Sequence, residues 1–217
     1  MAKTGILISF TDHHMNQVKG KLIVIEGIDG TGKSTQVSML AQALRQDGYQ
    51  VTESFEPTNG PWGTQLRESA TTGRLNIDQE LELFIKDRKQ HVEELILPAM
   101  ERGEIVILDR YYFSTMAYQG ARGVDPLSIR QQNETFAPTP DMLIILDLSV
   151  DTALDRIGIR DGEANEFEKT ESLQFCRDLF LSLEGEPHAH VIDAHAEVNE
   201  VHKRIMQAVT ATIDAHH

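Results

Sequence analysis

The stretch Gly27-Ile-Asp-Gly-Thr-Gly-Lys-Ser34 decides the fold. It matches the pattern G-x-x-x-x-G-K-[ST], in which glycines let backbone N–H groups turn inward around phosphate oxygens. The apolar run Leu22–Ile25 leads into it, and the helical segment Ser34–Arg45 follows with its positive dipole end toward the loop. We therefore expect a nucleoside triphosphate to be held by Gly27, Ile28, Asp29, Gly30, Thr31, Gly32, Lys33, Ser34 and Thr35.

Two side chains of this motif carry the chemistry. Lys33 supplies a positive charge to the β- and γ-phosphates, and the Ser34 hydroxyl is a ligand for Mg²⁺. The motif by itself does not name a reaction, because ATPases, GTPases, motor domains and small-molecule kinases all share it. The reaction must be inferred from the rest of the chain.

Outward from the motif, short apolar runs alternate with segments of helical spacing, such as 81–96. This alternation predicts an α/β fold of the P-loop NTPase type, with a five-stranded parallel sheet, helices on both faces and a short lid. We expect one domain over residues 20–217 and a weakly structured extension over residues 1–19. The predicted strands are Leu22–Ile25, Val51–Phe55, Ile105–Leu108, Leu143–Leu146 and His190–Ile192.

The composition limits the partners. The 217 residues include 20 Lys+Arg and 34 Asp+Glu, which gives a formal net charge of −14. This excess of acid argues against a protein that binds nucleic acid or an anionic membrane over its whole surface. The single cysteine, Cys176, excludes an internal disulfide and a cysteine-based zinc cluster. Because no apolar stretch is long enough to span a bilayer, we expect a cytoplasmic protein.

Two predicted strands end in aspartate, at Asp109 and Asp147, and either carboxylate suits Mg²⁺. Asp109 runs directly into Arg110 and a group of polar side chains. In open α/β sheets, ligands bind at this carboxyl edge of the strands. We therefore expect Ser34 and Asp109 to hold the metal, and Asp147 to cap the helix that follows it.

Two further features leave alternatives open. Phe84 and Arg88 lie four residues apart on one helix face, where they either bind a base and a phosphate or form core packing beside a surface charge. The segment Arg156–Glu166 carries two glycines and dense charge, which suits either a solvated loop or a lid that brings arginines over a site. Composition alone favours the solvated loop.

Taken together, the motifs resemble those of the thymidylate kinase family, which transfers the γ-phosphoryl group of ATP to dTMP. The resemblance covers nearly the whole chain from Lys21 onward. It rests on residues 27–35, on Phe-Ile-Lys-Asp-Arg at 84–88, and most specifically on Asp-Arg-Tyr-Tyr-Phe-Ser-Thr-Met-Ala-Tyr-Gln-Gly at 109–120. It implies an enzyme, a nucleoside monophosphate kinase of dTTP biosynthesis that uses Mg²⁺, ATP and dTMP and forms a homodimer.

The resemblance also implies an acceptor site. Phe84 would stack on thymine, and Arg88 would hold the base or its phosphate end. Tyr118 would crowd the sugar C2′ position and so favour deoxyribose, while Asp29 would bond the 3′-hydroxyl. The full set of implied dTMP-binding residues is Asp29, Glu56, Arg67, Phe84, Arg88, Arg110, Ser114, Thr115, Tyr118 and Gln119.

The same resemblance turns residues 156–168 into the family lid. Gly30 stands where some members carry an arginine, which implies that the catalytic arginines come from the lid. Arg156 and Arg160 are the candidates there. The implied catalytic residues are then Lys33, Arg110, Arg156 and Arg160.

The sequence departs from the family pattern at two places. Many members end the second strand in T-R-E-P, but this chain reads Ser54-Phe-Glu-Pro57, so Phe55 replaces an arginine that often binds the acceptor phosphate. Arg67 either restores that charge from the following helix or is an exposed helix arginine. The lid is also poor in arginine and rich in acid, which leaves open the relative roles of its two arginines.

Two other functions compete with dTMP kinase activity. Phe55 keeps open a P-loop kinase that acts on another nucleoside, nucleotide or small metabolite. A non-catalytic nucleotide switch that binds a partner protein is the alternative of a different class, and it leaves the cluster at 109–120 unexplained. Assays across a panel of acceptors separate the three.

Overall fold

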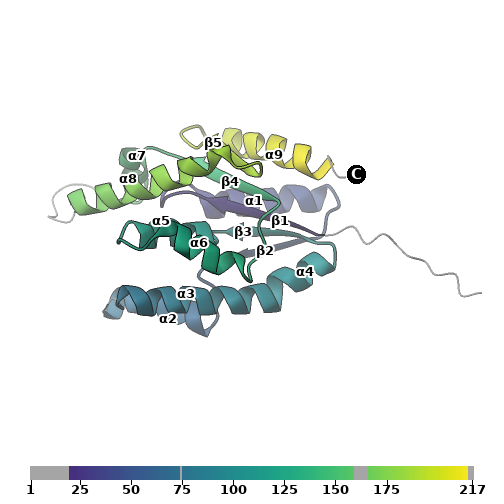
Figure 1. Cartoon of the computed structure of the whole chain (residues 1–217). Helices are drawn as coiled ribbons and strands as arrows, with labels where there is room; N and C mark the ends of the chain where they lie inside the picture. Colours follow the sequence, from purple (N-terminus) through teal and green to yellow (C-terminus); the bar gives the residue numbers. More distant parts are fainter. Residues whose placement is uncertain (1–19, 74, 159–165, 215–217) are drawn as a thin grey trace, which may run out of the picture.

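The computed structural model describes residues 20–73, 75–158 and 166–214. It confirms the predicted α/β fold, because five parallel strands form one sheet in the order β2-β3-β1-β4-β5 with helices packed against it (Figure 1). The extension 1–19 and lid residues 159–165, which include Arg160, lie outside the described residues. The strands are β1 (Lys21–Glu26), β2 (Val51–Phe55), β3 (Ile105–Asp109), β4 (Met142–Asp147) and β5 (Ala189–Asp193).

The helices follow the strands in the alternating order that the sequence predicts. In the described residues they are α1 (Lys33–Gln46), α2 (Pro61–Thr72), α3 (Ile77–His91), the π-helix η1 (Val92–Ile96), α4 (Leu97–Glu101), α5 (Tyr112–Gly120), α6 (Pro126–Glu134), α7 (Val150–Arg156), α8 (Glu166–Ser182), the short 3-10 helix η2 (Leu183–Gly185) and α9 (Val198–Asp214). Among the described residues, none of these helices combines the length and apolar character needed to cross a membrane.

The core lies on both faces of the sheet, because alternate strand residues point to opposite sides. On one face, Ile23 and Ile25 of β1 pack with α1 and α9. On the other face, Leu22 and Val24 pack with helices that include η1, α5 and α8. Burial on both faces explains why the strands read as continuous apolar runs in the sequence.

The strand ends bring the polar residues of the site to one edge of the sheet. Ile25 of β1 pairs with Asp109 of β3, and Phe55 of β2 pairs with the same residue. The loop after β1 and the loop after β3 therefore leave the sheet side by side. This is the carboxyl edge at which open α/β sheets bind their ligands.

The predicted helix at 81–96 belongs to a longer helical run through α3, η1 and α4. Pro98 has no N–H to donate to the carbonyl of Glu94, and its ring crowds that carbonyl. The wider π turn at Val92–Ile96 absorbs this conflict, with the N–H of Leu97 donating to the carbonyl of Val92.

The expectation that Asp147 caps the next helix is wrong. The N-cap of α7 is Ser149, whose side chain accepts a hydrogen bond from the N–H of Thr152. Asp147 instead ends β4 and accepts two hydrogen bonds from Arg177 of α8, at 2.7 and 3.0 Å. Asp147 lies two residues before the N-cap position, and its carboxylate forms a bidentate ion pair with a guanidinium instead of capping the helix.

Candidate active site

The glycine-rich loop between β1 and α1 has the backbone of a phosphate cradle. Gly32 is the N-cap of α1 and adopts a left-handed conformation with φ of 88°. Gly30 also has positive φ, and a Cβ on it would lie 2.6 Å from the carbonyl oxygen of Ala153 in α7. A larger residue such as arginine does not fit at position 30 without moving α7, so glycine is required there by packing as well as by dihedral angle.

Lys33 lies folded against this loop. Its Nζ donates hydrogen bonds to the carbonyl oxygens of Gly27, at 3.0 Å, and Ile28, at 2.9 Å, and the residue is only 6% exposed. Burial, followed by the nearby charge of Arg110, lowers the pKa of Lys33 from 10.5 to about 8. The lysine is therefore charged at neutral pH, but it loses its proton at a lower pH than an exposed lysine does.

Ser34 and Asp109 lie together, as the sequence predicts for a metal site. The Ser34 hydroxyl donates to Oδ2 of Asp109, which links the first turn of α1 to the end of β3. The other oxygen of this carboxylate, Oδ1, is buried and has no hydrogen-bond partner among the described residues. A buried carboxylate oxygen that lacks a partner, beside a serine hydroxyl, fits the hard oxygen ligands that Mg²⁺ takes together with nucleotide phosphates.

Arg110 joins the phosphate loop to the start of α5. Its guanidinium donates to Asp29 of the loop and, at 3.0 Å, to the hydroxyl of Ser114. It also stacks over the ring of Tyr118, with 5.2 Å from the guanidinium carbon to the ring centroid, and the Tyr118 hydroxyl donates to Asp29 at 3.4 Å. One cation is thus held between the glycine-rich loop and an aromatic side chain.

A cavity of about 220 Å³, which we call the small cavity, opens beside this arginine. Its wall combines aromatic side chains, two arginines and several hydroxyl and carboxylate groups, as expected of a site for a planar base that carries an anionic group. Every candidate dTMP-binding residue except Arg67 lines it. The lining residues are Asp29, Glu56, Pro57, Glu80, Phe84, Arg88, Arg110, Tyr111, Ser114, Thr115, Tyr118 and Gln119.

Arg88 forms the most buried ionic contact of this wall. The residue is 1% exposed, and its Nε donates to Glu56 at 2.7 Å. Its two other nitrogens donate to Asn133 at 2.6 Å and to Thr115 at 3.0 Å. His91, one turn further along α3, contacts Glu56 at 3.0 Å, so this carboxylate is held from two sides. Phe84 and Arg88 share the cavity face of α3, as their spacing predicts.

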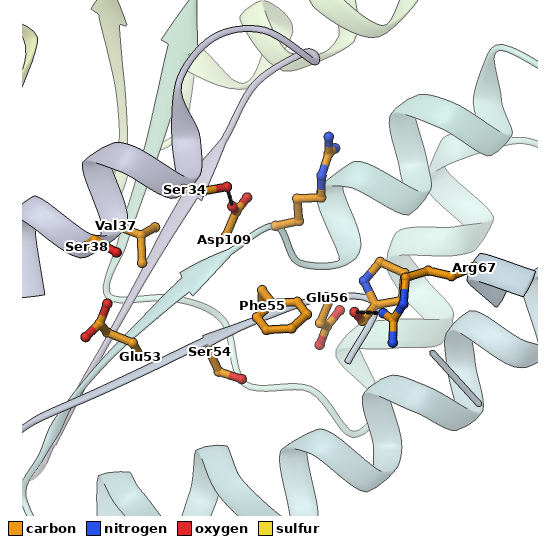
Figure 2. A pocket seen from close by; sticks show the side chains of 11 residues that line it. Ser34, Val37, Ser38, Glu53, Ser54, Phe55, Glu56, Arg67 and Asp109 are labelled. Atoms are coloured by element: carbon orange, nitrogen blue, oxygen red, sulfur yellow. Dashed lines mark hydrogen bonds between the residues drawn. The ribbon is translucent and has the colours of Figure 1, made fainter. Parts of the chain in front are cut away.

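A second, larger cavity of about 580 Å³ adjoins the small cavity and shares Glu56, Pro57 and Arg110 with it. We call it the large cavity. Figure 2 shows the Ser34–Asp109 hydrogen bond on one side of it, Arg67 on the other, and Phe55 between them. The guanidinium of Arg67 donates to the carbonyl oxygen of Pro57 at 2.8 Å. Arg67 therefore faces the cavity that Phe55 lines, although it does not line the small cavity.

Arg156 lies on a different side of the loop. It is exposed at the end of α7, where it donates to the carbonyl oxygens of Gly30, at 3.4 Å, and Ala194, at 3.1 Å. It thus bridges the phosphate loop and the segment between β5 and α9. Its catalytic role stays a prediction, as does that of Arg160, which lies outside the described residues.

Sequence reasoning missed three residues that hold the site together. Glu26 is fully buried at the end of β1, and the one signal for it is a charged residue closing an otherwise apolar strand. His91 follows Arg88 at a spacing of three, which places both on one helix face. Asn133 gave no signal, because it meets Arg88 only through the packing of α6 against the rest of the fold.

Comparison with known proteins agrees with this geometry. Residues 25–205 match the family model described as thymidylate kinase. A thymidylate kinase of Akkermansia muciniphila is 53% identical over 192 residues, covering 88% of this chain and 92% of the relative. One of Xanthomonas campestris pv. campestris is 51% identical over 194 residues, covering 89% of this chain and 85% of the relative. The chain belongs to the thymidylate kinase family.

Proposed function

We propose that this chain transfers the γ-phosphoryl group of ATP to dTMP and releases ADP and dTDP. An oxygen of the dTMP phosphate forms a bond to the γ-phosphorus, and the bond from that phosphorus to the β-γ bridging oxygen breaks. The acceptor oxygen is already anionic near neutral pH, so the reaction needs no general base. The protein has to place two anionic nucleotides in line and neutralise the charge between them.

The observation that carries this proposal is the position of Arg110. It lines both cavities and contacts Asp29, which lies inside the glycine-rich loop. A guanidinium at this position would contact both the phosphates of ATP bound on the loop and the phosphate of dTMP bound in the small cavity. Because charge spreads over the phosphoryl oxygens during transfer, a cation fixed at this junction stabilises the transition state more than either bound nucleotide.

The other candidates divide between the two nucleotides. Lys33 and the loop amides would bind the donor phosphates, and Phe84 would stack on the acceptor base. Ser34 and Asp109 would hold Mg²⁺, which when bound neutralises phosphate charge and orients the donor. Family membership and the aromatic side chains that line the small cavity support this division.

An acceptor panel tests the proposed function. ADP release is measured with dTMP, dUMP, dCMP and ribo-TMP, at saturating ATP and Mg²⁺. The proposal requires the highest kcat/KM with dTMP. A higher value with any other acceptor would favour a kinase of different specificity, and slow turnover with all four would favour a nucleotide switch.

Arg67 is our candidate for the charge that Phe55 does not supply. Phe55 is 42% exposed and lines the large cavity together with Arg67 and Arg110. The two arginines therefore line one cavity from α2 and from the segment after β3, and an acceptor phosphate there would meet both. Hydrogen bonds from Arg67 to Pro57 and Asn59 hold its guanidinium in that direction.

The preference for deoxyribose should depend on Tyr118. Its ring lines the small cavity and its hydroxyl contacts Asp29, our candidate for binding the 3′-hydroxyl, so a 2′-hydroxyl would crowd the ring. Tyr118→Ala is expected to reduce the ratio of kcat/KM between dTMP and ribo-TMP by about tenfold or more. Tyr118→Phe keeps the ring and should preserve most of the ratio. An alanine variant that rejects ribo-TMP as strongly as the parent would refute this role.

Binding of ATP should weaken at alkaline pH because of Lys33. Burial lowers its pKa in the ligand-free chain to about 8. Above that pH the fraction of uncharged Lys33 rises, and the uncharged amine no longer attracts phosphate. We expect ATP affinity to fall about tenfold per pH unit above that point, as measured by calorimetry up to about pH 9.5. Arg110→Ala removes a neighbouring positive charge and should move the onset upward. An affinity that stays constant over the whole range would contradict the assignment.

Two predictions from the sequence extend the proposal to the whole protein. We expect a homodimer, as the resemblance to the family implies, and sedimentation of the purified chain measures this directly. The cytoplasmic location also stays a prediction, and fractionation of cells that express the chain tests it.

A further inference from the structure

Glu26 is a carboxylate with no contact to solvent, placed one residue before the glycine-rich loop. Its Oε1 accepts hydrogen bonds from the N–H groups of Tyr111, at 2.8 Å, and Ser114, at 3.0 Å. Its Oε2 accepts from the hydroxyl of Ser114 at 2.7 Å. Burial raises the pKa of Glu26, while the nearby charge of Arg110 and these hydrogen bonds oppose the rise. All three of these hydrogen bonds hold the segment that follows β3.

The bond to the Ser114 hydroxyl has a directional consequence. A serine hydroxyl has one proton and two lone pairs. Because the proton is donated to Glu26, Ser114 turns a lone pair toward Arg110 and accepts a hydrogen bond from its guanidinium at 3.0 Å. Glu26 thereby sets the polarity of the group that holds the arginine.

The backbone of Arg110 needs the same support. This residue has φ of 70°, in the left-handed region that residues other than glycine rarely adopt. Its own N–H donates to the carbonyl oxygen of Ile25 at 3.0 Å, and the next N–H, of Tyr111, donates to Glu26. The unusual conformation is therefore held on both sides by the last two residues of β1.

We propose that Glu26 is a positioning residue for phosphoryl transfer, which fixes the direction of the Arg110 guanidinium through the Ser114 hydroxyl and the Tyr111 N–H. This inference rests on the proposed function, since Glu26 acts only through an arginine assigned to the transfer. Glu26 itself is fully buried and lines neither cavity. Its removal should therefore affect the chemical step more than the binding of ATP.

The sharpest test is Glu26→Gln, which keeps the size of the side chain, reverses the polarity of its bond to Ser114 and removes a buried negative charge near Arg110 and Lys33. The amide oxygen still accepts from both N–H groups, but the NH₂ group now donates to Ser114. The Ser114 proton then loses the carboxylate acceptor that fixed its direction, so the hydroxyl is no longer held with a lone pair toward Arg110. Loss of one hydrogen bond to a charged group should lower kcat with dTMP about tenfold, with the KM for ATP changed less than about twofold.

A double-mutant cycle with Ser114→Ala separates positioning from a general structural effect. If Glu26 acts through the hydroxyl, Glu26→Gln should change kcat less than about threefold in the Ser114→Ala background. Equal losses of kcat in both backgrounds would overturn the proposal, as would a loss shared equally by kcat and the affinity for ATP. Thermal unfolding of each variant shows that the protein measured is folded.

Two further measurements keep the outcomes distinct. A parent protein that forms no dTDP would overturn the proposed function, and the role of Glu26 with it; an active parent with an additive cycle would overturn the role of Glu26 alone. If Glu26→Gln does not fold, Ser114→Ala should still lower kcat about tenfold and Ser114→Thr, which restores a hydroxyl, should recover most of it. Equal kcat values for the Ser and Ala proteins would then overturn the proposal.

Discussion

Arg110→Ala is expected to lower kcat/KM for dTMP about a thousandfold while the protein stays folded. The large loss follows from its position, since the guanidinium lines both cavities and joins the glycine-rich loop to α5. No other described arginine lines both cavities. Coupled measurement of ADP release gives the kinetics, and thermal unfolding gives the stability.

The fold should survive this change because Asp29 tolerates the loss of Arg110, and the buried Glu26 carboxylate keeps its three hydrogen bonds from Tyr111 and Ser114 when the nearby charge of Arg110 is gone. The Asp29 side chain is 52% exposed, so water can replace the guanidinium. Arginine and alanine are both strained at φ of 70°, so the substitution adds little backbone cost. The matched control is Arg102→Ala, in which an exposed arginine before β3, at the opposite edge of the sheet, is truncated in the same way without loss of activity. Arg110→Ala with kinetics close to the parent would remove this residue from the mechanism.

Arg88 would be a poor choice for the same experiment, although it too carries a charge at the small cavity. It is 1% exposed, and its loss would leave the buried Glu56 carboxylate without its guanidinium. Breaking a buried pair from one side costs about 3–5 kcal/mol of stability. Lost activity in Arg88→Ala would therefore not separate folding from binding, whereas in Arg110→Ala it does.

The local parts of this molecule could be predicted from the sequence because short-range rules govern them. The strand–loop–helix unit around Lys33 follows from an apolar run, a glycine pattern and a helical spacing that adjoin in the chain. Phe84 and Arg88 reach one cavity because a spacing of four puts them on one helix face. The resemblance to the family then named residues of the same wall, such as Tyr118.

Contacts between distant segments escaped prediction. Nothing near Asn133 indicates that it meets Arg88, 45 residues earlier. Asp147 was misassigned because its real partner, Arg177, lies 30 residues further along the chain, whereas capping is a local rule. Glu26 was overlooked because a buried carboxylate makes sense only once its donors, Tyr111 before α5 and Ser114 within it, are known. Which distant residues meet is determined by the order of the strands in the sheet, and neither composition nor local spacing contains that information.

Asp109→Asn is expected to lower kcat/KM about a hundredfold and to raise the Mg²⁺ concentration needed for half-maximal rate. The neutral amide keeps the size of the side chain but loses the charge that a hard divalent cation prefers. The NH₂ group of the amide also replaces one of the two carboxylate oxygens. In the parent protein, Oδ2 accepts a hydrogen bond from Ser34, and the buried Oδ1 has no partner among the described residues. Either orientation weakens a pair of oxygen ligands, so Mg²⁺ titrations at fixed ATP should show a shifted midpoint.

The matched control is Asp147→Asn, which makes the same chemical change at the end of β4, the parallel strand that lies on the other side of β1 from β3. From the sequence alone, both aspartates were eligible for the metal. The carboxylate of Asp147 is occupied by the guanidinium of Arg177, so its substitution should lower the melting temperature and leave the Mg²⁺ midpoint unchanged. If the midpoint moves for Asp147→Asn and stays in place for Asp109→Asn, the metal belongs to β4, and the polar cluster after β3 serves the acceptor alone.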